Sequence, residues 1–140
     1  MEKSRKKGCL IVCVLLAALF IRYCVPVSYE ITDNYIVYPK GDALIPEDRD
    51  FGTKGHYLIC NPGCNFSVRI DNVKSIRWDK KHLIVEQREE GKSNWYLIIA
   101  KGEELQCCRD TLIGPVSRTE MDSLVHNKNL KLWKMKLKRF

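Results

Sequence analysis

The spacing of apolar residues between residue 28 and the C-terminus constrains the fold of this chain most strongly. These residues come in short runs that are rich in aromatic and β-branched side chains, and turn-forming residues separate the runs. We therefore predict a mostly β fold (β-rich α+β) built as an antiparallel meander sheet. The predicted strands are 28–31, 35–38, 56–60, 66–70, 73–78, 82–87, 95–100 and 105–108.

The connections and one strand can be predicted in more detail. The stretches 39–54 and 88–94 carry glycine and many charged residues, so we expect exposed loops there. Residues 60–64 contain Asn-Pro-Gly, which predicts a tight turn, and 79–81 should join their neighbouring runs as a hairpin. The run 95–100 is the most apolar one in this part of the chain, and we expect a central strand buried on both faces.

One helix is predicted near the C-terminal end. Ser117 and Glu120 have the spacing of a capping box, in which each side chain binds the other residue's backbone N–H. The helix should run from Arg118 to about His126. An apolar stripe along it is formed by Met121, Leu124 and Val125.

The last eleven residues alternate between apolar and basic side chains from Trp133 to Lys138. This alternation favours a final strand after the helix, because successive side chains of a strand point to opposite faces. The lysines then cover an exposed face and discourage sheet-to-sheet association. A functional alternative is attraction to anionic lipid or to an acidic envelope protein through Lys134, Lys136 and Lys138.

The N-terminus carries an export signal. Four basic residues within the first seven are followed by Gly8 to Ile21, fourteen residues without a charge. We therefore divide the chain into a signal sequence or membrane anchor at 1–27 and a single β-rich domain at 28–140. The expected topology is a cytoplasmic N-terminus and an extracytoplasmic domain, with the membrane bound through the N-terminus.

Three fates of this segment stay open. As an uncleaved anchor, fourteen helical residues span about 21 Å, so the helix would have to extend to Val27 to cross a bilayer. Cys24 lies at a suitable distance for lipidation, although Tyr23 is a poor residue to precede it. Ordinary cleavage would require small residues after the apolar run, and none forms the usual pattern.

The net charge of +7 does not indicate nucleic-acid binding. Ten of the basic residues lie in the two ends of the chain, whereas residues 8–127 contain fourteen basic and sixteen acidic side chains. A nucleic-acid-binding domain needs a basic face on its folded body. We therefore expect no nucleic-acid partner.

Four of the seven cysteines belong to the predicted domain, in a compartment that permits disulfides. One interpretation is a structural disulfide between Cys60 and Cys64. Others are inert thiols, a zinc site, or a redox-active pair at the same two residues. The adjacent Cys107 and Cys108 would point to opposite sides of a strand, which makes them poor ligands for one metal.

Part of the chain resembles a known family. The motifs are Trp78-Asp79 at the end of a strand, Trp95-Tyr96-Leu97-Ile98-Ile99, and Gly114-Pro115-Val116-Ser117 opening a helix with Glu120. In this order they resemble a family of small exported bacterial proteins, often lipoproteins, that is classed as a domain of unknown function. The resemblance covers roughly residues 73–124 and implies no known activity.

Two positions depart from the family pattern. Ala100 stands where members of the family usually carry Asp, and Tyr23 stands where a small residue precedes a lipidated Cys. No catalytic residue can be carried over to this chain.

No catalytic, cofactor or metal-binding motif is recognisable, and His56, His82 and His126 lack a second ligand or nucleophile at a characteristic spacing. We therefore favour a non-enzymatic module with a binding or structural role in the cell envelope, without a cofactor. A thiol-, disulfide- or metal-binding envelope protein is the alternative, and a small hydrolase is the third hypothesis. The alternative would use Cys60, Cys64, Cys107 and Cys108.

Overall fold

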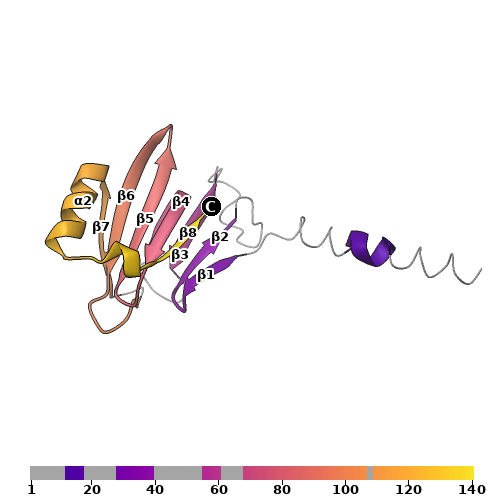
Figure 1. Ribbon diagram of the computed structural model, residues 1–140, viewed down its shortest axis with the longest axis horizontal. Coiled ribbons are helices and arrows are strands. Elements are labelled where there is room, and N and C mark those ends of the chain that lie inside the picture. The colour runs from indigo at the N-terminus through magenta and orange to yellow at the C-terminus, as the bar shows by residue number, and fades with distance from the viewer. Residues whose placement is uncertain (1–11, 18–27, 40–54, 61–67, 107–108) are drawn as a thin grey trace, which may run out of the picture.

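The computed structural model describes residues 12–17, 28–39, 55–60, 68–106 and 109–140. From residue 28 on, these residues form eight strands, one α-helix and one short 3-10 helix (Figure 1). The strands are β1 (Tyr29–Thr32), β2 (Tyr35–Tyr38), β3 (His56–Cys60), β4 (Arg69–Trp78), β5 (His82–Glu89), β6 (Lys92–Ile99), β7 (Thr111–Val116) and β8 (Lys136–Arg139). The helices are α2 (Arg118–Asn127) and the 3-10 helix η2 (Leu132–Lys134).

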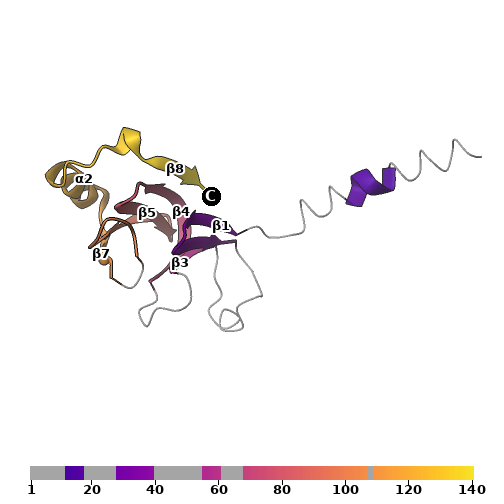
Figure 2. The ribbon, with the colours of Figure 1, turned by 90° about the horizontal axis from the view of Figure 1, so that it is seen from below.

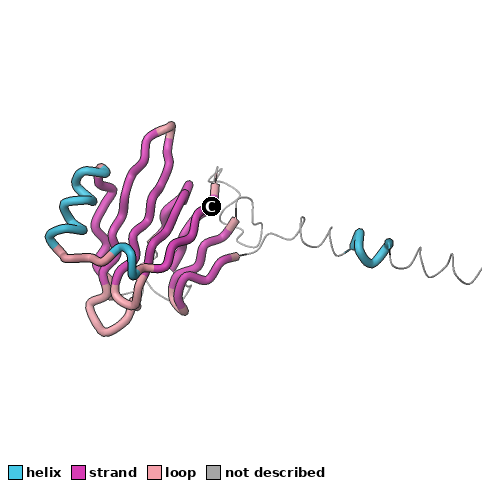
Figure 3. The backbone as a smooth tube through the Cα atoms, in the orientation of Figure 1, coloured by secondary structure: helices cyan, strands magenta, loops and turns pink. Residues whose placement is uncertain are grey.

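All eight strands belong to one antiparallel sheet. The strands from β1 to β7 are neighbours in sequence order, and β8 returns to pair with β4. Figure 3 shows how strands dominate the domain, with the helix beside the β7 end of the sheet. The predicted meander, with one helix followed by a final strand, is therefore confirmed.

Strand β4 corrects the prediction of two separate strands at 66–70 and 73–78. The chain continues through Asp71 and Asn72 as one ten-residue strand. Asn72 adopts a φ of 53°, which asparagine tolerates better than most residues, and the pairing with β5 shifts between Val73 and Ser75. Along one edge of β4, the first part of the strand pairs with β3 and the last part with β8. The partner on this edge therefore changes at the irregularity.

The expected loop at 88–94 is also wrong, because β5 and β6 continue into a tight hairpin. Only Glu90 and Gly91 form the turn, with φ values of 48° and 82°. Two left-handed residues match the twist of a two-residue hairpin. The predicted hairpin between β4 and β5 is confirmed, and the Asp79 carboxylate accepts hydrogen bonds from the backbone N–H groups of Lys81 and His82 at 2.7 and 2.8 Å.

Strand β7 was not predicted, and a strand was expected at 105–108 instead. Residues 105 and 106 are not in a strand, and 107–108 lie outside the described residues. The sequence of β7 contains Gly114 and Pro115, which usually end strands. Here β7 pairs with β6 alone, and proline is tolerated in such an edge strand because one side of the strand needs no ladder hydrogen bonds.

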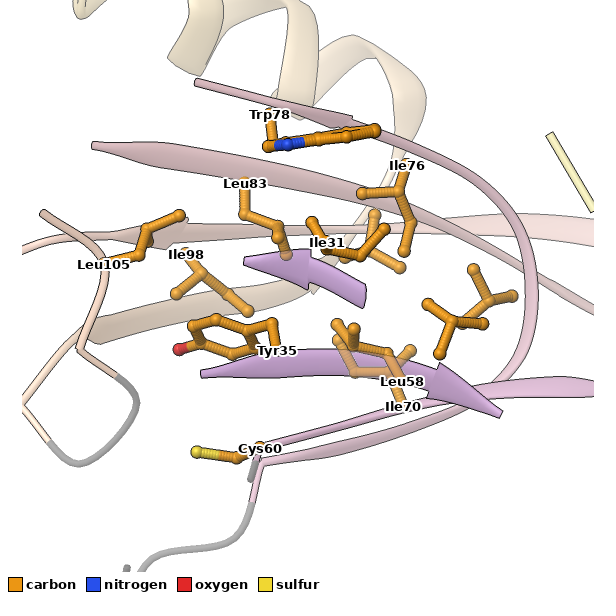
Figure 4. Close-up of a cluster of buried hydrophobic side chains, with 13 residues drawn as sticks. Ile31, Tyr35, Leu58, Cys60, Ile70, Ile76, Trp78, Leu83, Ile98 and Leu105 are labelled. Carbon is orange, nitrogen blue, oxygen red and sulfur yellow. The ribbon is translucent and has the colours of Figure 1, made fainter. Parts of the chain in front are cut away.

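The curled sheet encloses a hydrophobic core, which we call the inner core (Figure 4). Side chains from both halves of the sheet meet there, and Tyr35, Leu58, Ile76, Leu83 and Ile98 are fully buried. Cys60 and Leu105 belong to the same cluster. Burial of this apolar surface is the main stabilising contribution to the domain.

A second cluster, the helix-side core, lies on the opposite face of the sheet. Ile84 and Leu97 point outward from β5 and β6 and pack against Met121 of α2 and Met135. Figure 2 shows α2 and β8 on one side of β4 and β5, with β3 on the other. Leu97 and Ile98 are both completely buried although they face opposite sides, which confirms the central strand expected at 95–100.

Helix α2 begins as predicted. The Ser117 hydroxyl accepts the Glu120 backbone N–H, and the Glu120 carboxylate accepts the Ser117 N–H at 2.7 Å. The last strand is shorter than expected, because Leu132–Lys134 forms η2 and the strand begins only at Lys136. Leu130 and Leu132 pack against the helix-side core and so hold the connection beside α2, where it forms the short 3-10 helix.

The N-terminal segment is described only at residues 12–17, which are helical. Within the residues that the structure describes, no helix is both long and apolar enough to cross a membrane. The other predicted features of this segment, including Cys24, lie outside the described residues, as does most of the predicted loop at 39–54.

Candidate functional site

A groove lies between the outer face of the sheet and the elements that follow β7, and we call it the sheet–helix groove. Its volume is about 520 Å³. One face of strands β4, β5, β6 and the paired β8 lines the groove, together with residues of α2 and Leu132. The residues that line it are Lys74, Ser75, Arg77, Ile84, Glu86, Trp95, Arg118, Met121, Asp122, Val125, Leu132, Leu137, Arg139 and Phe140.

The middle of the groove is apolar. Ile84 and Met121 are buried, and they belong to the helix-side core that continues under the groove. Leu137 on β8 keeps 42% of its surface exposed, although its alternation in the strand turns it toward this face. Charged and polar side chains surround this apolar part, and small-molecule sites commonly combine apolar contacts with a few polar groups that orient the ligand.

The carboxylate of Glu86, which lines the groove, forms hydrogen bonds and an ion pair with neighbouring residues. Glu86 accepts hydrogen bonds from the hydroxyls of Ser75 and Ser93 at 2.8 and 3.1 Å, and Lys74 Nζ lies 3.5 Å away. Burial raises the pKa of Glu86, but these hydrogen bonds and the Lys74 charge outweigh burial and lower the pKa below its ordinary value. Glu86 is therefore an ionised, internally compensated group of the groove.

The helix wall carries an ion pair above an aromatic ring. The Arg118 guanidinium carbon lies 4.9 Å from the centre of the Trp95 ring, and Arg118 Nε lies 3.3 Å from Asp122 Oδ1. The Trp95 indole N–H is covered and has no acceptor within the described parts of the chain. Arg118 thus forms a cover over Trp95 at one side of the groove.

Two arginines of the groove have no carboxylate partner among the described residues. Arg77 Nη1 donates only a long hydrogen bond, 3.5 Å, to the Leu132 carbonyl. Arg139 lies on β8 and pairs across from Ser75, whereas Arg77 pairs across from Leu137. The two arginines are therefore diagonal neighbours on adjacent strands and share the face that lines the groove.

A smaller hollow of about 430 Å³ lies at one end of the inner core. Trp78 and Leu105 form its apolar part, and Asn34 Nδ2 donates to the Leu105 carbonyl at 3.1 Å. At its margin, Lys80 Nζ and Glu104 Oε1 form an exposed ion pair at 2.8 Å. Acidic and basic groups are balanced here, so the hollow shows no charge preference.

The candidate lipid-binding lysines do not all face the same surroundings. Lys134 and Lys136 lie at the margin of this hollow, and both are exposed. Lys138 instead places its ammonium group 4.6 Å from the centre of the Tyr29 ring. Beside them, Trp133 keeps 79% of its surface exposed, the largest exposure of any described large hydrophobic residue.

Cys60 is a buried, disulfide-bonded residue at the end of β3. Its backbone N–H donates to the Val68 carbonyl at 3.2 Å, which brings the two ends of the intervening loop together. The sequence-predicted partner Cys64 lies outside the described residues, as do Cys107 and Cys108. The Cys60–Cys64 pairing therefore stays a prediction.

The three histidines are dispersed. The His56 ring lies 5.0 Å from that of Phe140, and burial lowers its pKa. His82 Nδ1 lies 3.2 Å from Asp79, and His126 is exposed near the end of α2. Within the described part of the chain, no three His, Cys, Asp or Glu residues are placed to hold a metal ion.

The sheet–helix groove was not predicted from the sequence. Its arginines, Arg77, Arg118 and Arg139, come from three separate elements and follow no local spacing. The only sequence signal was the alternation in the last strand, and it drew attention to the lysines rather than to Arg139, which lies on the other face.

Comparisons with known proteins identify no relative. No protein-family model matches the chain, and no curated protein or solved structure matches it either. The resemblance to exported proteins of unknown function thus remains a sequence-based prediction.

Proposed function

We propose that this chain is a membrane-tethered, extracytoplasmic module that acts by binding rather than by catalysis, and that its C-terminal segment docks on anionic lipid. The supporting observation is Trp133, which is 79% exposed within a segment that carries six basic residues and no acidic one. We call residues 128–139 the C-terminal basic segment.

An exposed indole among lysines suits the interface of a membrane. Tryptophan prefers the headgroup layer, because its ring is apolar and its N–H can remain hydrated. Lysines near an anionic surface contribute about 1 kcal/mol each, so Lys134, Lys136 and Lys138 together favour docking by about 3 kcal/mol. In water, most of the apolar surface of Trp133 stays exposed, whereas a headgroup layer would cover it.

The start of the domain supports the same orientation. Tyr29 opens β1, and its ring lies 6.1 Å from the ring of Phe140 and 4.6 Å from the Lys138 ammonium. The first residue of β1 therefore lies beside the end of β8. A tether formed by residues 1–27 would keep β8 close to the bilayer and raise the effective concentration of the weak lipid contacts.

Fluorescence quenching tests the docking. The full chain is reconstituted into nanodiscs that contain anionic lipids brominated near the headgroup, and tryptophan emission is recorded. We expect strong quenching in the native chain and its loss in Trp133→Phe, because Trp78 is buried and Trp95 lies in the groove. Quenching should weaken at high salt, since charge attraction at a surface is screened.

A matched pair of lysine variants separates local charge from total charge. The triple variant K134Q/K136Q/K138Q should lose most of the quenching. The control K81Q/K92Q/K101Q removes three exposed lysines elsewhere and should retain it. Equal quenching in zwitterionic and anionic discs, or equal loss in both triple variants, would refute lipid docking by the C-terminal basic segment.

A further inference from the structure

We infer that the sheet–helix groove binds a small carboxylate ligand with an apolar body. The groove uses Leu132, Leu137 and Arg139 of the C-terminal basic segment but not its lipid-docking lysines. Arg77 and Arg139 face the groove, whereas Lys136 and Lys138 point to the other side of β8. The inference stands or falls independently of the function proposed above.

The charges of the groove are the first argument. Four basic residues, Lys74, Arg77, Arg118 and Arg139, line it together with two acidic ones. The acidic residues are already engaged, Glu86 with Lys74 and Asp122 with Arg118. Within the described residues, Arg77 and Arg139 thus keep an uncompensated positive charge beside the apolar residues of the groove, such as Ile84 and Leu137.

The register of β4 and β8 is the second argument. Diagonal neighbours on adjacent antiparallel strands lie about 7–8 Å apart, within reach of long side chains. Arg77 and Arg139 hold this relation on the groove face, so their guanidinium groups can approach one anion from two directions. Like charges at this separation repel each other, and an anion between them removes that cost.

The apolar lining specifies the rest of the ligand. Ile84, Met121, Val125, Leu132 and Leu137 surround the middle of the groove. Its volume of about 520 Å³ falls in the range of small-molecule sites, roughly 300–1,000 Å³. This space accepts one short hydrocarbon chain or one ring system next to the carboxylate, and a free inorganic anion would leave the apolar walls without contact.

A guanidinium group suits a carboxylate for geometric reasons. Its planar array of N–H donors matches the two carboxylate oxygens, and such charge-assisted bonds are stronger than neutral ones. Among the described residues, Arg77 donates a single long hydrogen bond, to the Leu132 carbonyl, so its other donors can bind a ligand. Trp95, which lies under Arg118 at the edge of the groove, provides an internal reporter of occupancy.

Calorimetric titration with octanoate tests the inference. The full chain is kept in non-ionic maltoside micelles, and the heat of titration into empty micelles is subtracted. We expect saturable binding that Arg77→Gln and Arg139→Gln each weaken by roughly 10- to 100-fold, the range for one charge-assisted hydrogen bond. Arg109→Gln is the matched control, because Arg109 is exposed outside the groove, and it should bind like the native chain.

Tryptophan fluorescence tests whether octanoate binds in the groove rather than elsewhere on the protein. Octanoate should shift the Trp95 emission of a Trp133→Phe chain, which locates the ligand in the groove, and the emission should not change in Arg139→Gln at the same concentration. Arg139 is exposed, so this variant tests the site even if Arg77→Gln fails to fold. Absence of saturable octanoate binding, equally tight binding of uncharged 1-octanol, or equal weakening in the Arg109 control would overturn the inference.

Discussion

At the scale of single residues, the disulfide of Cys60 offers a direct test of the predicted pairing. The chain-entropy relation gives about 2 kcal/mol for the short loop closed by Cys60–Cys64 and about 4 kcal/mol for a bond to Cys107 or Cys108. We predict that Cys60→Ser lowers the free energy of unfolding by about 2 kcal/mol in urea titrations. Peptide mapping without reductant should recover Cys60 joined to Cys64, and a peptide that joins Cys60 to residue 107 or 108 would refute the local pairing.

A second residue-scale prediction concerns Glu86 and pH. Its pKa is lowered from the ordinary value of 4.5, so the folded state holds the ionised form more strongly than the unfolded state does. The resulting stabilisation is complete above about pH 4.5 and is lost as the pH falls through the lower folded pKa. The free energy of unfolding of Glu86→Gln, measured by urea titration, should therefore fall furthest below that of the native chain at neutral pH. A difference that grows as the pH falls below 4.5 would contradict this assignment.

At the scale of elements, Gly114 limits how β7 can pair with β6. Its φ is 132°, and an added Cβ would lie 2.6 Å from the Trp95 carbonyl oxygen and 2.9 Å from the Tyr96 ring. Gly114→Ala should therefore destabilise the domain by about 2 kcal/mol or more, since both backbone strain and steric overlap act at this position. Gly102→Ala is the control, because no atom lies within 4 Å of the added Cβ, and thermal unfolding of this variant should be almost unchanged.

The helix cap gives a smaller element-scale effect. Ser117→Ala removes the acceptor for the Glu120 backbone N–H and should cost about 1 kcal/mol. Ser123→Ala in the same helix removes a hydroxyl that donates only to the Thr119 carbonyl, and it should be neutral within about 0.5 kcal/mol. Equal losses in the two variants would show that the cap itself does not stabilise α2.

Local signals in the sequence were sufficient for several elements. The capping box of α2, the β4–β5 hairpin and the doubly buried run at 95–100 all depend on short-range patterns, and the structure has them as predicted. The same short-range patterns did not predict strand β7 or the continuous strand β4. The reason is that Gly114, Pro115 and Asn72 are residues that normally break strands. An edge position and a β-bulge accommodate them here, and both depend on tertiary pairing.

The candidate sites depended even more on tertiary structure. The alternating lysines of the last strand marked the C-terminal basic segment, although the sequence did not indicate that Trp133 would be exposed. The sheet–helix groove needs β4, β8 and α2 to be brought together, and only the return of β8 to β4 places Arg139 beside Arg77. A sequence pattern confined to one element cannot contain that relation.

At the scale of the whole molecule, the proposed lipid docking and the proposed ligand site use opposite faces of β8. The proposed docking needs Trp133 and the lysines to face a bilayer, and the contacts of Tyr29 with Phe140 and Lys138 place the first strand of the domain beside β8. The groove faces the other side of β8. In the proposed orientation, a domain held at the membrane by β8 would keep its groove directed away from Lys136 and Lys138.

Protease accessibility in intact spheroplasts tests the central claim, the membrane tether with an extracytoplasmic domain, most directly. The full chain carries an epitope tag after Phe140, and protease is added from outside before the membranes are collected. We predict that the untreated protein sediments with the membranes and that external protease removes the tag while a cytoplasmic marker stays intact. A tag that external protease cannot remove until the spheroplasts are lysed, or a protein that stays in the cytosolic fraction, would contradict the account.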